Sequence, residues 1–388
     1  MYNVLKLNEI SHVADSIFEE NNIKTSTDCK NPDAIILRSY NMHELSLNKE
    51  LLCVARAGAG VNNIPVEKCS KEGIVVFNTP GANANAVKEL VMCCLFLGSR
   101  QIIDAIDWAK ELKGKGTEVA ALVEKGKSKF TGQEVIGKKL GIIGLGAIGA
   151  RVANSAASLG MTVLGYDPYI SVDSAWGLSR SVHRITDLNA IIKESDYISI
   201  HVPYSKSNKG FINKDNIKLM KDGVVIINCS RAELVENDDI INAVNSGKVG
   251  RYITDFPADE LINVPNIICI PHLGASTPEA EDNCAVAAAS ELVNFIKDGT
   301  IKNSVNFPNV DMAKAGVERL TIIHHNIKNI LSQITSKISA QNINIANFVD
   351  KSIEELAYCI LDLDEKSDTA LIKELEAIEG VIKVRVIK

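Results

Sequence analysis

Short apolar segments alternate with longer polar or amphipathic stretches through most of this 388-residue chain. Four early segments predict the strands of a small parallel sheet, because each is mostly apolar and is bounded by polar residues. They lie at 3–7, 34–38, 51–55 and 74–78. Six further segments, separated by helical spacers, predict a larger doubly wound α/β domain. They lie at 140–143, 162–166, 197–202, 224–228, 251–255 and 266–270.

The pattern changes in the last quarter of the chain. A long helical pattern at 281–297 is followed by a polar, proline-containing segment at 306–316, which we interpret as a linker. The tail then predicts strand 319–324, helix 330–341, strands 345–348 and 356–363, helix 367–378 and strand 381–387. This β-α-β-β-α-β order is typical of a ferredoxin-like module. We expect regulation or assembly from it, because it contains no recognisable pair of nucleophile and base.

The most specific motif is a glycine pattern, Gly144, Gly146 and Gly149, directly after the apolar segment 140–143. The first glycine allows a tight strand-to-helix turn, the second lets the backbone approach a pyrophosphate, and the third allows close packing of helix on strand. Asp167 ends the next strand, where its carboxylate would accept hydrogen bonds from ribose hydroxyls and repel a 2′-phosphate. The motif predicts NAD rather than NADP. The alternative is a structural glycine turn beside an ordinary exposed aspartate.

Composition narrows the class of protein. The length suits two or three domains, the net charge is −6, and no basic stripe with interleaved aromatic residues is present, which argues against nucleic acid as a partner. The amino terminus has polar residues among its apolar ones, and no segment has eighteen uninterrupted apolar residues, so we expect neither a signal peptide nor a membrane span. The nine cysteines lack metal-ligand spacing. We therefore expect no metal and buried thiols in a reducing cytoplasm.

Three ionisable residues follow strands of the nucleotide domain: Arg231, Glu260 and His272. They belong near the carboxyl edge of the sheet, where ligands of open α/β sheets bind. Oxidation of a 2-hydroxy acid needs a base, a cation for the carboxylate and a hydride acceptor, which His272, Arg231 and NAD would supply. Glu260 would fix the tautomer of His272 and raise its pKa. A single charged residue after a strand is usually a solvated surface charge, so only the three residues together indicate a catalytic site.

At these positions the chain resembles the D-isomer-specific 2-hydroxyacid dehydrogenases, whose signature places an arginine, an aspartate, a glutamate and Pro-His-x-Gly in this order. The resemblance assigns Asp255 and Glu260 to the two acids. Ala232-Glu233 replaces the usual Gly-Gly and Leu261 the usual proline, so Asp259 remains an alternative to Glu260. The implied cofactor contacts are Gly144, Gly146, Ala147, Ile148, Gly149, Asp167, His201, Pro203, Cys229, Asp255 and Gly274. For His201 and Cys229, plain packing at strand ends is equally consistent.

Within that family the chain most resembles the phosphoglycerate dehydrogenases with a carboxy-terminal ACT domain. That resemblance implies NAD-dependent oxidation of D-3-phosphoglycerate to 3-phosphohydroxypyruvate, the first step of L-serine biosynthesis. The segments at 36–39 and 54–63 resemble loops whose arginines face the substrate phosphate, which gives Arg38, Ser39, Arg56 and Gly58 as substrate contacts. The alternatives are a glyoxylate or hydroxypyruvate reductase, another D-2-hydroxyacid dehydrogenase, and an NAD(H)-sensing binding protein.

The resemblance also implies the domain layout and the partners. A flavodoxin-like substrate-binding domain would comprise 1–97 and 283–305, a Rossmann-like NAD-binding domain 98–282, and the ACT domain 317–388. The family forms homodimers and homotetramers. In the tail, His324, Asn326 and Asn344 match positions that bind a serine effector. Lys328-Asn329 replaces the usual Pro-Gly and adds bulk there, although asparagine tolerates a left-handed backbone.

Overall fold

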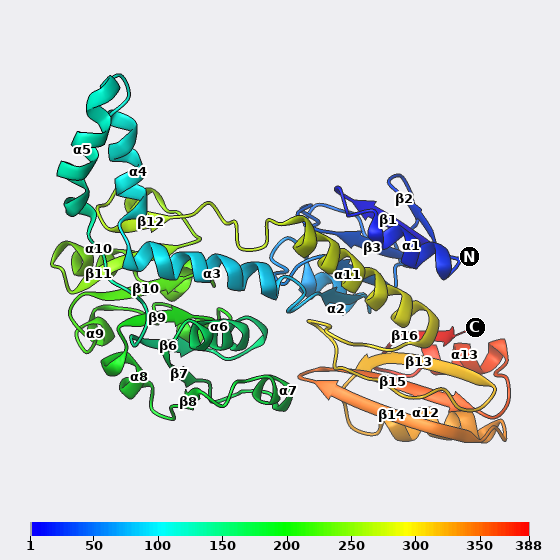
Figure 1. The fold of residues 1–388 in the computed structure, drawn as a ribbon. Helices are drawn as coiled ribbons and strands as arrows, with labels where there is room; N and C mark the ends of the chain where they lie inside the picture. The colour runs from blue at the N-terminus through cyan, green and yellow to red at the C-terminus, as the bar shows by residue number, and fades with distance from the viewer. Residues whose placement is uncertain (1, 388) are drawn as a thin grey trace. The chain divides into compact units, whose positions relative to one another are not determined.

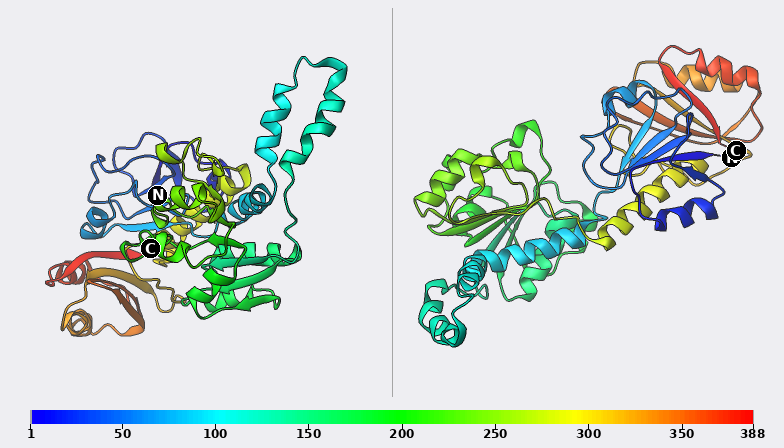
Figure 2. Two further views of the ribbon diagram at one scale, coloured as in Figure 1. Left: turned by 90° about the vertical axis from the view of Figure 1, so that its left-hand side faces the viewer. Right: turned by 90° about the horizontal axis from the view of Figure 1, so that it is seen from above.

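The computed structural model describes residues 2–387, and the chain divides into two compact units (Figure 1). The first unit combines the residues up to Ala82 with those from Glu281 onward, and the second comprises Asn83–Ala280. The first boundary lies earlier than the expected 97/98, because helix α3 (Ala84–Ser99) buries Val91 and Leu95 in the core of the second unit. Figure 2 gives two further views of the ribbon.

The first unit contains a five-stranded parallel sheet in the order β2-β1-β3-β4-β5, which is the flavodoxin-like order expected. The strands are β1 (Asn3–Leu7), β2 (Lys24–Ser26), β3 (Ala34–Leu37), β4 (Cys53–Arg56) and β5 (Val75–Asn78), and helices α1 (Val13–Glu20), α2 (Val66–Lys71) and α11 (Pro278–Asp298) belong with them. Helix α11 contributes Phe295, whose ring packs edge-on against Phe77 of β5 at 5.7 Å. This contact joins chain segments from the two ends of the sequence into one core.

The second unit contains a seven-stranded sheet in the order β12-β11-β10-β9-β6-β7-β8. The strands are β6 (Lys139–Ile143), β7 (Thr162–Tyr166), β8 (Val182–Arg184), β9 (Tyr197–Ile200), β10 (Val224–Asn228), β11 (Val249–Thr254) and β12 (Ile267–Cys269). The helices around it are α3, α6 (Ala147–Ser158), α7 (Val172–Trp176), α8 (Leu188–Glu194), α9 (Lys214–Ile217) and α10 (Asn237–Asn245). The strand order reverses between β6 and β9, which marks the switch point where doubly wound sheets bind nucleotides.

A helical hairpin projects from the second unit, formed by α4 (Ile102–Glu111) and α5 (Val119–Gly126) (Figure 1). The Trp108 ring of α4 packs against the ring of Phe130, which follows α5, with centroids 5.4 Å apart, and this contact joins the two arms of the hairpin. No side chain of α4 is buried, and Ile106 is 51% exposed. Apolar side chains are therefore left on the surface of this arm.

The tail folds as the predicted β-α-β-β-α-β module. Its antiparallel sheet has the order β14-β15-β13-β16, formed by β13 (Glu318–His325), β14 (Ile345–Ile353), β15 (Leu356–Leu363) and β16 (Val381–Ile387). Helices α12 (Ile330–Ala340) and α13 (Thr369–Glu376) cover one face with a separate apolar core. The opposite face packs on the rest of the first unit, where the ring of Tyr358 lies 6.2 Å from that of Phe295. The module is thus docked within the unit.

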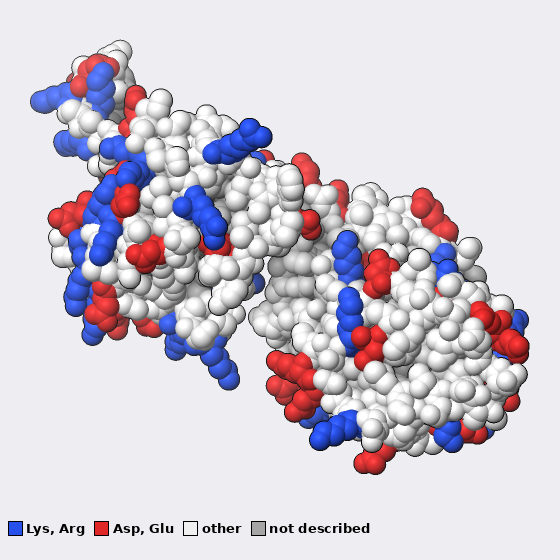
Figure 3. Space-filling view, turned by 90° about the horizontal axis from the view of Figure 1, so that it is seen from below, with Lys and Arg blue, Asp and Glu red and all other residues white. Residues whose placement is uncertain are grey.

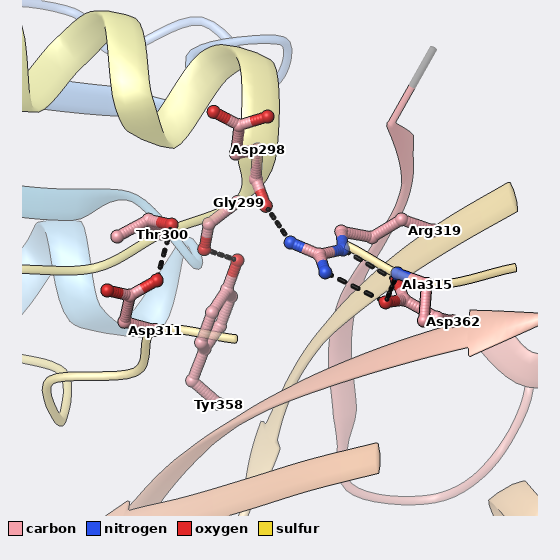
Figure 4. A network of polar contacts seen from close by, with 8 residues as sticks. All are labelled: Asp298, Gly299, Thr300, Asp311, Ala315, Arg319, Tyr358 and Asp362. Atoms are coloured by element: carbon pink, nitrogen blue, oxygen red, sulfur yellow. Dashed lines mark hydrogen bonds and ion pairs between the residues drawn. The ribbon is translucent and has the colours of Figure 1, made fainter. Parts of the chain in front are cut away.

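A buried ion pair ties the module to the end of α11 (Figure 4). Arg319 donates through Nε and Nη2 to the two carboxylate oxygens of Asp362, at 2.6 and 2.8 Å, and the two side chains are 1% and 0% exposed. The third nitrogen, Nη1, donates to the Asp298 carbonyl at 3.0 Å. Beside it, the Tyr358 hydroxyl donates to the Gly299 carbonyl at 2.6 Å. These bonds satisfy buried polar groups on both sides of the junction.

The surface carries charges of both signs. On the face drawn in Figure 3, basic and acidic side chains are interspersed over both units.

Within residues 2–387, no helix combines the length and the apolar character that crossing a bilayer requires. All nine cysteines are unpaired thiols.

Candidate functional site

The turn between β6 and α6 has the geometry that a pyrophosphate needs. Gly144 has a φ of 93°, and a Cβ there would lie 2.5 Å from the His201 carbonyl oxygen. A Cβ on Gly149 would lie 2.0 Å from the Gly144 carbonyl oxygen, so only glycine lets the helix pack this closely. A Cβ on Gly146 would meet nothing within 4 Å, which leaves open space in front of the first amides of α6, at Ala147 and Ile148. The turn fits a dinucleotide phosphate.

Asp167 follows β7 and is held beside the glycine turn. Its Oδ2 accepts a hydrogen bond from the Leu145 amide at 2.8 Å, and its Oδ1 accepts one from the Tyr169 amide at 2.8 Å. These bonds orient the carboxylate next to the place where the adenosine ribose of a bound dinucleotide would lie. The acid therefore supports NAD as the cofactor.

Two neutral side chains lie at the ends of β9 and β10. His201 follows β9, and its Nε2 lies 2.8 Å from the Ser199 hydroxyl. Burial lowers the pKa of His201 to about 4, so the imidazole is uncharged at neutral pH. Contact with the Cys94 thiol, together with burial, raises the pKa of Cys229 well above its usual range. Both residues can line the cofactor region, with Pro203 in the loop after His201, but neither adds charge to it.

Asp255 organises the loop that carries His272. It is 1% exposed, and its carboxylate accepts hydrogen bonds from the Leu273 and Gly274 amides at 2.7 and 2.8 Å. Its carbonyl accepts another from the His272 amide at 3.1 Å. Burial raises the pKa of Asp255, while the bonds from Leu273 and Gly274 oppose that shift. The sequence indicated a cofactor contact here and missed this loop-holding arrangement.

His272 itself is exposed and has an unusual backbone conformation. Its φ is 55°, a region that few non-glycine residues adopt, and its ring lies 5.0 Å from that of Phe256. The hydrogen bonds to Asp255 hold this conformation, which presents the imidazole at the carboxyl edge of the sheet. Such an outlier is a feature of functional loops.

Arg231 and Glu260 lie on loops after β10 and β11. Arg231 donates from Nη1 to the Ser230 carbonyl at 2.7 Å. Glu260 is exposed and accepts a hydrogen bond from Asn237 at 2.8 Å, which lowers its pKa. The expected hydrogen bond between Glu260 and His272 is not formed within residues 2–387, and Asp259 does not replace it. The part of Glu260 in orienting the histidine stays a prediction.

In the first unit, Arg38 and Arg56 lie at the ends of the adjacent strands β3 and β4. The Arg56 Nε donates to the Arg38 carbonyl at 3.0 Å, and Arg38 Nη1 lies 2.5 Å from Glu281 Oε1. A Cβ on Gly58 would lie 2.3 Å from Arg56 Nη1, so the glycine leaves room for this guanidinium. The exposed Ser39 follows Arg38. Glu281 could not be predicted from the sequence as part of this cluster, because an acid in the first turn of a helix is typical of helix starts in general.

The tail residues expected to bind an effector do not share one site within a chain. His324 is 1% exposed, with Nε2 3.0 Å from Asp350 Oδ1. Burial alone would lower its pKa, but the bonds to Asp350 and to the His325 carbonyl outweigh burial and raise it. Asn326 lies just beyond the same end of β13, whereas Asn344 precedes β14 at the opposite end of the sheet. About eight strand residues, or roughly 25 Å, separate the two asparagines.

Comparisons with known proteins agree with this geometry. The model of the D-isomer specific 2-hydroxyacid dehydrogenase NAD-binding domain matches residues 95–274. D-3-phosphoglycerate dehydrogenase of Escherichia coli K12 is 32% identical over 352 residues, which are 87% of this chain and 82% of that relative. The D-3-phosphoglycerate dehydrogenase of Methanocaldococcus jannaschii is 32% identical over 79% of this chain. This match spans only 58% of the length of that relative.

Solved structures show the same architecture. NAD+-bound 3-phosphoglycerate dehydrogenase of Entamoeba histolytica matches with a TM-score of 0.62 and 27% identity, covering 79% of this chain and 98% of that one. Holo D-mandelate dehydrogenase of Rhodotorula graminis matches with a TM-score of 0.67 and 21% identity, covering 80% and 99%. At that identity the second match shows the fold alone.

Proposed function

The chain belongs to the D-isomer specific 2-hydroxyacid dehydrogenases, and from this premise we propose that it oxidises D-3-phosphoglycerate to 3-phosphohydroxypyruvate with NAD, the first step of L-serine synthesis. The observation that carries the choice of substrate is the pair Arg38 and Arg56 at neighbouring strand ends. A phosphate with two negative charges calls for more than one cation, and guanidinium groups match its geometry. The two relatives named above support the same choice.

Each residue has a separate task in the proposed reaction. Arg231 binds the substrate carboxylate, and His272 takes the proton of the 2-hydroxyl group as the carbonyl forms. Bound NAD supplies an acceptor for the hydride that leaves C2. Asp255 keeps the His272 loop in place through its hydrogen bonds to Leu273 and Gly274.

Arg56→Met is expected to raise KM for D-3-phosphoglycerate by about 10- to 100-fold, the scale of one lost charge-assisted hydrogen bond. The side chain lies in the first unit, so NAD affinity is expected to stay unchanged. Steady-state NADH formation measures both quantities. D-glycerate, which lacks the phosphate, is the control substrate, and its KM should not move. An equal change in KM for both acids would remove Arg56 from phosphate binding.

Two alternatives remain distinct from this proposal. A glyoxylate or hydroxypyruvate reductase would use the same Arg231 and His272 but would have no need of paired arginines. An NAD(H)-sensing protein would bind the cofactor and turn over none of these acids. Activity with unphosphorylated acids alone would favour the first, and cofactor binding without turnover would favour the second.

We also propose that two copies of the chain associate through the tail module and bind serine between them. A single site that uses His324, Asn326 and Asn344 needs Asn344 from a second copy, because this residue lies at the far end of the sheet. Saturating L-serine is expected to raise the dimer fraction in sedimentation velocity runs, and Asn326→Ala and Asn344→Ala should each abolish that response. A mixture of the two variants should recover part of it, because each mixed dimer keeps one intact site. Failure of serine to change the wild-type sedimentation or Tm would contradict the proposal.

A further inference from the structure

Two cations of β16 face the junction between the tail module and the rest of the first unit. Lys383 and Arg385 pair with Ile323 and Thr321 of β13, so they point away from α12 and α13. Lys383 donates from Nζ to the Leu51 carbonyl at 2.8 Å. Arg385 donates from Nη2 to the Phe295 carbonyl, and its guanidinium carbon lies 4.5 Å from the centre of the Phe295 ring. Neither contact supplies a negative charge.

The remaining donors of Arg385 are buried and unused. Its Nε and Nη1 have no hydrogen-bond partner, although both atoms are inaccessible to solvent. Within residues 2–387, no carboxylate forms an ion pair with Arg385 or Lys383. Burial of an unpaired charge with unsatisfied donors is costly, so such a group normally has a partner.

The neighbouring groups cannot provide that partner. Cys53 is fully buried nearby, and burial raises its pKa to about 12, so the thiol is neutral at physiological pH even beside the two cations. Burial likewise raises the pKa of Tyr358 to about 12, and its hydroxyl is already bonded to Gly299. Glu50 and Glu72 act on Lys383 only at longer range. The junction is therefore positively charged.

A small cavity lies where these groups meet. Its volume is about 10 Å³, and its lining includes Leu52, Gly73, Phe295, Tyr358, Lys383 and Arg385. This volume admits one water-sized group. The backbones approach closely around it, because a Cβ on Gly73 would lie 3.0 Å from Ile382 Cγ2. The cavity thus has cationic and apolar walls and room for one small species.

We infer that this cavity is a binding site for a single halide ion, held by Arg385 and Lys383. The anion supplies the charge that the junction lacks and accepts from the unused donors of Arg385. Because the site exists only when the module is docked, occupancy stabilises the docked state.

The test is thermal unfolding of the full chain at constant ionic strength, with sodium isethionate replaced stepwise by chloride or by formate. The isethionate anion is too large for the cavity. Chloride at ten times its dissociation constant is expected to raise Tm by about 3–6 °C, the shift for a ligand of the native state in a unit of this size. Formate has three heavy atoms and exceeds the volume of the cavity, so it should give no shift. An equal shift with formate and chloride would contradict a site for one halide ion.

Two variants separate this site from general salt effects. Arg385→Met is expected to lose the shift. Lys351 is another lysine of the module, and its Nζ donates to the Asn309 carbonyl in the linker. Lys351→Met should therefore keep the Tm shift. If Arg385→Met does not fold, Lys383→Met provides the same comparison. Absence of a shift in the wild type, which would mean that a structural water fills the cavity, or an equal shift in Arg385→Met, would overturn the inference.

Discussion

Replacement of His272 by alanine is expected to lower turnover by about two to four orders of magnitude, the usual contribution of a general base. In the proposed reaction, the imidazole takes the hydroxyl proton at the carboxyl edge of the nucleotide-binding sheet. It projects from a loop whose backbone is fixed by Asp255, so the substitution removes the base without loss of the loop's hydrogen bonds. NAD affinity, followed by fluorescence titration with NADH, should stay nearly unchanged, because the glycine turn lies on a different loop.

A second histidine of the same unit serves as the control. His183 lies exposed on the edge strand β8, away from the proposed chemistry, so His183→Ala should leave turnover and NADH affinity unchanged. Undiminished turnover in His272→Ala would remove the histidine from the mechanism. A loss of turnover accompanied by an equal loss of NADH affinity would point to a disturbed loop.

Asp362→Ala is expected to destabilise the docked tail module by about 3–5 kcal/mol, the cost of leaving one partner of a buried ion pair without the other. Arg319 would retain its bond to the Asp298 carbonyl but would hold an uncompensated charge at 1% exposure. The Ala315 amide, which donates to the same carboxylate at 2.7 Å, would also lose its partner. Urea unfolding of the full chain, followed by circular dichroism, measures the change.

Two controls test whether the buried charge is the cause. In the double variant Arg319→Met with Asp362→Leu, both charges are replaced by apolar groups, so most of the lost stability should return. The Ala315 amide and the Asp298 carbonyl still lack their partners, which keeps the recovery incomplete. Glu374→Ala breaks the ion pair of Glu374 with Lys337, whose side chains are each 47% exposed, and should cost less than about 1 kcal/mol. Equal effects of Asp362→Ala and Glu374→Ala would contradict the account.

The strands of the two parallel sheets could be predicted where the segment has a continuous apolar centre. The segments 162–166 and 224–228 match β7 and β10 residue for residue, because strands buried on both faces are apolar at most positions, and here Thr162 and Asn228 lie only at strand ends. Strands β2 and β8 were not predicted. Each lies at a sheet edge, and the sequences Lys-Thr-Ser and Val-His-Arg carry little of the apolar pattern that marks a central strand.

The site could be predicted where one residue type is required by local geometry. Gly144 and Gly149 are examples, since a Cβ at either would strike backbone atoms. Contacts between residues that are far apart in the sequence could not be predicted in this way, because they depend on how the elements pack. The partner of Glu260 is Asn237, and the ion pair of Arg38 is with Glu281. In β16, charged and apolar residues alternate, a pattern that predicts solvent exposure for the charged side chains. Arg385 nevertheless lies against the Phe295 ring.

The most direct test of the proposed function is NADH formation by the wild-type protein with D-3-phosphoglycerate, beside D-glycerate and D-lactate, at alkaline pH with the keto product trapped. We expect rapid NADH formation with the phosphorylated acid and little with the other two, because only the first uses both Arg231 and the Arg38–Arg56 pair. Equal or faster turnover of the unphosphorylated acids, or none with any of the three, would contradict the proposed function.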